Sequence, residues 1–191
     1  MWAATNYGVV KINPFNYKVD TLNNDVVLKK LPKKRTKYIF EDSKNRMWFG
    51  THTNGVYRYD EKDGSLIQFK DKQGIAAHCY QIKEDRHGNI YIAHDDGFSI
   101  IDNNDVVKNY NTKNGLRNRL TEDFLFGDDG YVYIANHNTI LRFNPSLSEF
   151  KYYDEYFGNS KSQFVALVLS QEFMSFFVWI NFIVISCAKL D

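Results

Sequence analysis

The sequence of 191 residues is poor in cysteine, proline and net charge. Its two cysteines, Cys79 and Cys187, form no CxxC pair and have no neighbouring pair of histidines, which excludes a structural zinc site. Cys79 lies among apolar and aromatic residues and is predicted to be a small core residue. A disulfide bond between Cys79 and Cys187 is the alternative if the chain is exported. Three prolines and eleven glycines are too few for a low-complexity or disordered chain.

The formal net charge is only +1, which gives no overall field to attract nucleic acid or a membrane surface. Local charge is less even, because residues 29–37 hold six cations in nine positions. We interpret this run as a solvated loop between two sheets, interrupted by Pro32; a localisation signal or an anion patch is the alternative. Basic and aromatic residues do not alternate as they do in single-strand binders, so we expect no nucleic-acid partner.

A secretory leader is also missing. The chain enters a strand pattern directly at Met1 and Trp2, without a basic segment, an apolar run and a small-residue cleavage site. We therefore expect a cytoplasmic chain or a piece of something longer. Residues 173–188 are apolar, but these sixteen residues are interrupted by Ser175, Asn181 and Ser186 and fall short of the roughly 20 that a spanning helix needs. Buried strands and a translated frameshift are favoured there over an interfacial or partial membrane segment.

What the sequence does contain is a repeat. An aromatic residue in a strand pattern is followed six or seven residues later by a small residue that opens the next strand, in four copies: Trp2 to Gly8, Trp48 to Gly55, Tyr91 to Gly97 and Tyr133 to Thr139. The leading aromatics are 46, 43 and 42 residues apart. An aromatic content of 16% suits pleated sheets, and a period of about 40–45 residues built from short strands is the signature of β-propeller blades.

Alternating residues and turn signals predict four antiparallel strands in each complete copy. The predicted fold class is all-β, a partial β-propeller of about three complete four-stranded blades plus incomplete terminal blades. We expect propeller repeats over residues 1–157, with a blade remnant at 1–20 and blades at about 37–70, 79–110 and 122–153. Residues 158–191 are expected to be a degenerate further blade or an apolar tail, with Phe176 at the repeat position of the aromatic.

Closure of the propeller is left open by the sequence. If residues 164–169 supplied the strand missing before Trp2, the blades would form a four-bladed ring, which is the low end for propellers. We favour an open arc, because the turn residues of the repeat are lost after Gly158. An open arc leaves sheet edges unpaired, so the expected protein partners are the remaining propeller blades or a second copy that associates through these edges.

Residues 39–51 and 82–93 resemble the two-component regulator propeller repeat. That pattern has Glu-Asp, then Gly-Asn in a turn, then Trp in a strand followed by Gly-Thr, and Gly-Leu before each new blade. The matches include Glu41-Asp42, Glu84-Asp85, Gly88-Asn89, Gly74-Ile75 and Gly115-Leu116. The departures are Asn45 for the turn glycine, Gly127 where the family prefers Asp, Tyr91 and Tyr133 for Trp, and fewer blades than the family's propellers contain.

The resemblance implies the extracytoplasmic sensor region of a hybrid two-component regulator, and hence a periplasmic location. Many such regulators respond to carbohydrate fragments, so the implied ligand is an oligosaccharide. The histidine kinase of such a parent is missing from this sequence, as are a receiver domain and a helix-turn-helix. The alternative is a protein-interaction scaffold or a truncated gene remnant without a small-molecule ligand.

Three histidines follow the repeat aromatics at the same end of consecutive blades: His52, His94 and His137. Convergent imidazoles could bind a ligand, which makes these three the candidate ligand-binding residues, although solvated turn residues are the favoured interpretation. Asp42 and Asp85 recur once per blade and are predicted to fix turns rather than to act as acid or base. The repeat aromatics are predicted to be core residues. No catalytic motif or metal-ligand run appears, so we expect no enzyme activity, no metal and no cofactor.

Overall fold

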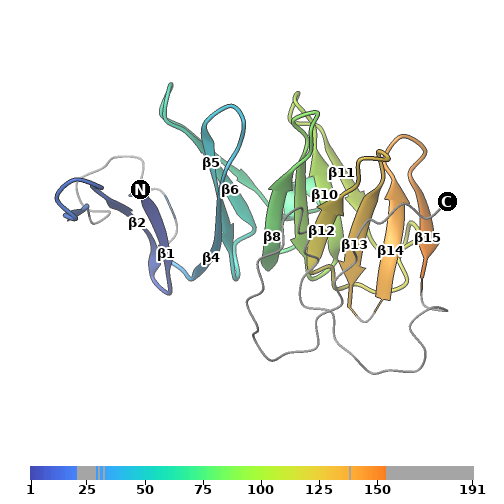
Figure 1. Ribbon diagram of the computed structural model, residues 1–191. Helices are drawn as coiled ribbons and strands as arrows, with labels where there is room; N and C mark the ends of the chain where they lie inside the picture. The colour runs from blue at the N-terminus through green and yellow to red at the C-terminus, as the bar shows by residue number, and fades with distance from the viewer. Residues whose placement is uncertain (21–28, 30, 32, 138, 154–191) are drawn as a thin grey trace, which may run out of the picture.

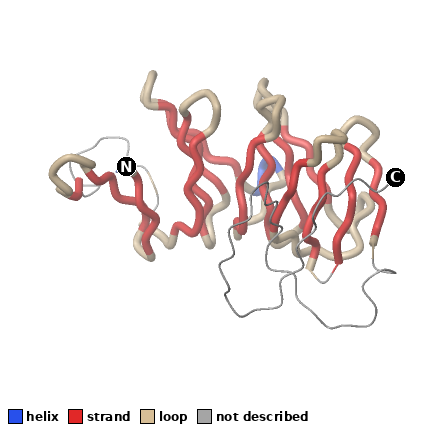
Figure 2. The backbone as a smooth tube through the Cα atoms, viewed as in Figure 1, coloured by secondary structure: helices blue, strands red, loops and turns tan. Residues whose placement is uncertain are grey.

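The computed structural model describes residues 1–20, 29, 31, 33–137 and 139–153. These residues form antiparallel strands and one short 3-10 turn, η2 (Asp71–Gln73), so that strands dominate the backbone (Figure 2). No helix in the described ranges is long and apolar enough to cross a membrane. The predicted segments at 154–191, including 164–169 and Phe176, lie outside the described residues.

Four sheets follow one another along the chain. The first has three strands, β1 (Trp2–Thr5), β2 (Gly8–Ile12) and β3 (Val19–Asp20). The second contains β4 (Thr36–Glu41), β5 (Arg46–Thr51), β6 (Val56–Asp60) and β7 (Ser65–Phe69). The third contains β8 (Cys79–Glu84), β9 (Ile90–His94), β10 (Gly97–Ile101) and β11 (Val107–Tyr110). The fourth contains β12 (Asp123–Phe126), β13 (Val132–Asn136), β14 (Thr139–Asn144) and β15 (Glu149–Tyr152).

Within every sheet, neighbouring strands are consecutive in sequence and antiparallel. The predicted fold class is therefore confirmed: three complete four-stranded units and an incomplete first one. The sheets stand side by side in chain order (Figure 1). Their first strands, β4, β8 and β12, lie next to one another and are called the inner strands below. The four described sheets share no strand pairing with one another, and the open arc stays a prediction because residues 164–169 lie outside the described residues.

Antiparallel strands place alternate connections at opposite ends of the sheets. We call one end the turn rim; it carries the β4–β5, β6–β7, β8–β9, β10–β11, β12–β13 and β14–β15 turns and lies at the top of Figure 1. The other end, the linker rim, carries the β5–β6, β9–β10 and β13–β14 turns together with the segments that lead from one sheet to the next. The three predicted histidines belong to the linker rim.

Apolar side chains from facing sheets fill the space between them. Trp48 is fully buried and stacks on Phe69 at 5.5 Å, in a cluster that also contains Ile82 and Ile92 of the third sheet. The corresponding Tyr91 of the third sheet packs edge-on against Phe124 of the fourth, at 5.5 Å. Burial of such aromatic side chains is worth roughly 2–3 kcal/mol each, and it explains why the aromatic recurs once per sheet. The prediction of core aromatics is confirmed for Trp48 and Tyr91.

Cys79 is likewise a buried core residue, as predicted, and burial raises the pKa of its thiol to about 12. It sits beside Gly50, where an added Cβ would come within 2.6 Å of the Cys79 Sγ. The small size of both residues therefore lets the inner strand of the third sheet approach the second sheet closely.

The turn aspartates have the structural role predicted for them. Oδ1 of Asp42 accepts hydrogen bonds from the backbone N–H groups of Lys44 and Arg46, at 3.0 and 2.9 Å, and Oδ2 accepts one from Trp48 Nε1 at 2.8 Å. Asp85 fixes the next turn in the same way through the N–H groups of His87 and Asn89. Asp42 thus joins the turn to the core aromatic.

Candidate functional site

The three predicted histidines lie at the same rim but in different environments, and they do not converge. His52 occupies the β5–β6 turn and is half-buried. His94 is the last residue of β9 and is 1% exposed, so its interpretation as a solvated turn residue is wrong. His137 lies in the β13–β14 turn with a φ of 58°. This is the left-handed conformation, which is uncommon for residues other than glycine.

The imidazole of His94 is held on both sides. Its Nδ1 accepts the backbone N–H of Asp96 at 3.2 Å, so Nε2 carries the proton and donates to Ser99 Oγ at 2.9 Å. That hydroxyl in turn donates to Asn109 Oδ1 at 2.6 Å. Burial lowers the pKa of His94 to about 4, against a smaller opposite effect of Asp95 and Asp96. The ring is therefore neutral at pH 7 and braces the end of the third sheet.

His52, in contrast, belongs to a cluster of basic side chains that the sequence analysis did not find. His52 Nδ1 lies 3.1 Å from His78 Nε2, and Lys37 Nζ lies 2.8 Å from the same atom. His78 stands directly before β8, in the segment that joins the second and third sheets. We name Lys37, His52 and His78 the basic cluster. The only hint in the sequence is that His78 and Lys37 stand near the starts of successive inner strands, and nothing in it shows that they meet each other or His52.

Tyr80 extends this cluster along the inner strands. Its ring stacks on His78, with centroids 4.3 Å apart and planes 18° from parallel, and Lys37 Nζ lies 5.3 Å from its centre. Lys37 and Tyr80 both occupy β-bulges, since the strand pairing skips one residue between Thr36 and Tyr38 and again between Cys79 and Gln81. A bulge re-aims a side chain, and here the same backbone irregularity occurs at two residues whose side chains meet between neighbouring inner strands.

Glu122 holds the same repeat position one sheet further on, directly before β12. Burial raises its pKa to about 7, and its Oε2 is closed off from solvent without a hydrogen-bond partner among the described residues. Burial, then the charges of Asp95 and Glu122, raise the pKa of the Tyr80 hydroxyl, which places both carboxylates in its neighbourhood. Lys37, Tyr80 and Glu122 thus form an inner row, one residue from each of three sheets.

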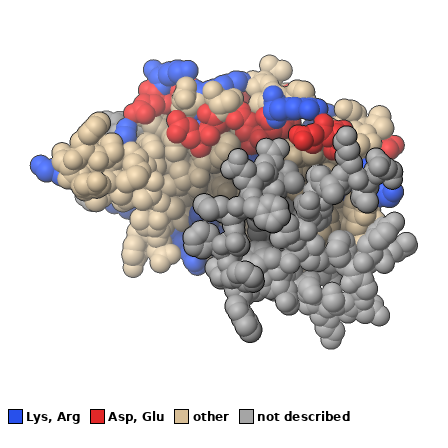
Figure 3. Space-filling view, in the orientation of Figure 1, with Lys and Arg blue, Asp and Glu red and all other residues tan. Residues whose placement is uncertain are grey.

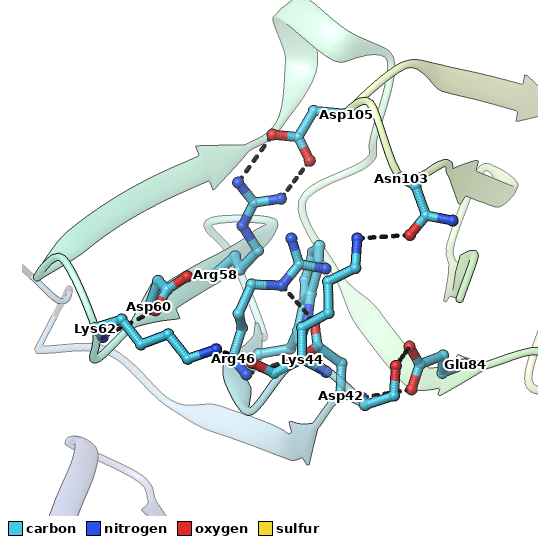
Figure 4. Close-up of polar contacts among 11 residues, drawn as sticks. Asp42, Lys44, Arg46, Arg58, Asp60, Lys62, Glu84, Asn103 and Asp105 are labelled. Carbon is cyan, nitrogen blue, oxygen red and sulfur yellow. Dashed lines mark hydrogen bonds and ion pairs between the residues drawn. The ribbon is translucent and has the colours of Figure 1, made fainter. Parts of the chain in front are cut away.

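The turn rim has many charged residues, but they pair across neighbouring sheets (Figure 3). Arg58 of the second sheet makes a two-pronged ion pair with Asp105 of the third, in which Nη2 and Oδ2 are 2.8 Å apart (Figure 4). Lys44 donates to Asn103, and Ser43 donates to Glu84, across the same boundary. These groups hold sheets together and are engaged, so they make a weaker ligand site than the inner row.

A cleft of about 600 Å³ opens on the turn rim between the third and fourth sheets. Its walls include Asp85 and Asn89, which fix their own turn, and the exposed Asp128 and Asp129. No group of three or more potential metal ligands occurs within residues 1–20, 33–137 and 139–153. The walls of the cleft are acidic.

Comparisons with known proteins agree with this architecture. Residues 30–53 match the family model of the two component regulator propeller, which covers β4, its turn and β5. No match was found among curated proteins. The chain thus carries a repeat of the regulator-propeller type, in the copy where the pattern is fullest.

Solved structures of the same fold come from sensor and lyase proteins. The extracellular domain of the hybrid two component system BT3049 from B. thetaiotaomicron has a TM-score of 0.62 and 18% identity over 78% of this chain and 21% of that one. The extracellular domain of BT4673 from the same organism has a TM-score of 0.61 and 20% sequence identity, and the match covers 79% of this chain and 23% of that one. The virginiamycin B lyase of Staphylococcus aureus has a TM-score of 0.56 and 17% sequence identity, and the match covers 80% of this chain and 54% of that one. This chain spans about a fifth of the two extracellular domains, and the likeness shows the propeller fold.

Proposed function

We propose that this chain is the ligand-sensing propeller portion of a hybrid two-component regulator, that it responds to a carbohydrate, and that it performs no catalysis itself. The observation that carries the proposal is the inner row, in which a half-buried aromatic ring has a cation 5.3 Å from its centre and a carboxylate at the same repeat position one sheet further on. The regulator-propeller repeat at residues 30–53 and the extracellular domains of the same fold support the sensor role. They also support an extracytoplasmic, periplasmic location.

The chemistry of the inner row suits a sugar. A pyranose presents apolar C–H groups on its faces and hydroxyl groups around its edge, so it packs against an aromatic face and exchanges hydrogen bonds with charged groups beside it. Tyr80 supplies the ring, while Lys37 can donate and Glu122 can accept.

The test is binding of an oligosaccharide panel, measured by thermal shift and then by calorimetry. We expect at least one oligosaccharide to raise the Tm of the wild type, and Tyr80→Ala to weaken its binding about tenfold or more, since a stacked aromatic contributes over 1 kcal/mol. Tyr7→Ala is the matched control, because Tyr7 is 83% exposed and far along the chain from the row. A folded sample that binds no member of the panel would contradict the carbohydrate proposal.

A second role, as an interaction scaffold, is favoured by the outer face of the fourth sheet. Leu125, Tyr133 and Arg142 are cross-strand neighbours there, just as Phe40, Trp48 and Arg58 are on the face of the second sheet that meets the third. Arg58 uses that position to bind the next sheet through Asp105. The fourth sheet therefore repeats an inter-sheet surface, which fits a further propeller sheet supplied by a second copy of the chain.

Sedimentation over a range of concentrations tests this second role. We expect concentration-dependent association of the wild type, weakened by Arg142→Glu and unchanged by Arg86→Glu, since Arg86 is exposed on the turn rim. A monodisperse monomer at every concentration would remove the support for self-association.

A further inference from the structure

We propose that the basic cluster of Lys37, His52 and His78 is an oxyanion subsite, which binds a sulfate, phosphate or carboxylate group. The inference rests on the ligand-binding role proposed above and deepens it by naming a charged group that the ligand carries. The three side chains come from the inner strand β4, the β5–β6 turn and the segment before β8, so the fold brings them together from separate parts of the chain.

The donors of the cluster converge on one point. Lys37 Nζ and His52 Nδ1 lie 2.8 and 3.1 Å from the same atom, Nε2 of His78. When Nε2 of His78 is unprotonated, its single lone pair accepts from Lys37 or from His52. Once His78 takes up a proton there, three N–H donors face one another within a hydrogen-bond length, and an anion with several oxygens satisfies all of them with charge-assisted hydrogen bonds.

The positive charges around the cluster outnumber the carboxylates near it. None of its three members forms an ion pair with a carboxylate in the described part of the chain, whereas Lys11, Lys83, Arg58 and Arg119 do. The groups that face His78 are Lys37, His52 and Arg35, all basic, and the single carboxylate of Asp95. Burial first, and then the positive charges of Lys37 and His52, lower the pKa of His78. A bound anion would reverse the second effect.

The residues of the basic cluster and Tyr80 beside it are accessible to a saccharide ring that carries the anionic group. Lys37 is exposed, and His52, His78 and Tyr80 are half-buried. Tyr80 stacks on the His78 imidazole and fixes its plane. A saccharide ring beside Tyr80 therefore places a charged substituent within reach of the cluster.

Histidine titration by NMR tests the subsite on the full chain. The chain has five histidines, and His78→Asn identifies the resonance of His78. With sodium sulfate replacing sodium chloride at equal ionic strength, we expect the pKa of His78 to rise by about 1 unit, while that of His87 on the turn rim stays unchanged. Lys37→Gln should abolish the rise, and Lys108→Gln, which removes an exposed lysine of β11, should keep it. No rise in the wild type, or an equal rise in Lys37→Gln, overturns the proposal.

Three probes separate the subsite from the carbohydrate role: inorganic sulfate, galactose 6-sulfate and galactose. If galactose 6-sulfate binds more tightly than inorganic sulfate and galactose, the result supports both the oxyanion subsite and the carbohydrate role. A His78 response to inorganic sulfate without binding of any saccharide supports the subsite as a site for a free oxyanion and removes the carbohydrate role. Binding of neutral saccharides without any His78 response to sulfate overturns the subsite and leaves the carbohydrate role standing.

Discussion

At the scale of single residues, Glu122 couples the stability of the molecule to pH. Its pKa is raised to about 7 by burial, whereas a glutamate in an unfolded chain titrates near ~4.3. Between these two values the folded chain holds a proton that the unfolded chain has released. The stabilising effect of the protonated form is therefore complete below about pH 4.3 and is lost as the pH rises through about 7.

Glu122→Gln should remove this dependence. We expect the variant to be more stable than the wild type at pH 8 by about 1 kcal/mol, a value kept small because the residue as a whole is only half-buried, and to match it at pH 4.5. Urea unfolding at the two pH values measures the difference, with Glu149→Gln as a control on an exposed glutamate. Equal pH dependence in wild type and Glu122→Gln would contradict the assignment.

Single residues also mark where the sequence was informative and where it was not. Asp42 could be assigned a turn role because its contacts are local, within six residues along the chain. His78 could not be connected to His52 and Lys37, since their contacts span 26 and 41 residues and depend on how two sheets face each other. The burial of His94 was missed for a similar reason, because β9 pairs there with the inner strand β8, where Cys79 lies opposite His94 and 15 residues away along the chain.

At the scale of strands and turns, the β9–β10 connection depends on a glycine. Gly97 has a φ of 112°, and an added Cβ would come within 2.0 Å of the backbone O of Tyr110 on β11. Gly64, in the β6–β7 turn, has a φ of 68° but open space around it. The two positions therefore share an unfavourable backbone conformation for other residues and differ in steric room.

Alanine at each position separates these effects. Gly64→Ala should cost about 1 kcal/mol of unfolding free energy, the strain of a left-handed residue alone. Gly97→Ala should cost at least about 3 kcal/mol, because β10 and β11 must also move apart. Denaturant unfolding of both variants measures the difference, and equal losses would show that the close approach to Tyr110 is not important.

Strand order and register were largely predictable from the sequence, because alternation and turn residues are local signals with one dominant period. Asn45 shows how tolerant that signal is: it replaces the turn glycine and adopts a φ of 60°, which asparagine accepts better than most residues. The bulges at Lys37 and Tyr80 were not predictable, since a bulge is defined by the partner strand and leaves no mark in either strand alone.

At the scale of the whole molecule, the sheets depend on their neighbours through both apolar contacts and the ion pair of Arg58 with Asp105. The Arg58 side chain is only 9% exposed and that of Asp105 is 39% exposed, so the pair is partly shielded from solvent. The hydrogen bond from Arg58 lowers the pKa of Asp105, and the pair therefore stabilises the fold above about pH 4 and loses this effect at lower pH.

A double-mutant cycle with Arg58→Met and Asp105→Asn measures this connection. We expect a coupling energy of about 1 kcal/mol at pH 7 that falls as the pH drops below about 4 and the carboxylate takes up a proton. The pair Lys70 and Asp71, which is exposed and local, should show almost no coupling and serves as the reference. A coupling energy near zero for Arg58 and Asp105 at pH 7 would mean that apolar packing alone joins the sheets.

The bulge that recurs at the start of the inner strands has a consequence for how this architecture can change. Lysine and tyrosine occupy the bulged position in successive sheets, and glutamate occupies the same repeat position in the next, although the three side chains share no charge, size or polarity. The backbone geometry is therefore indifferent to the side chain that it presents. Substitution at these positions therefore changes the charge and size of the side chain on the inner strands while the turn aspartates and core aromatics stay in place.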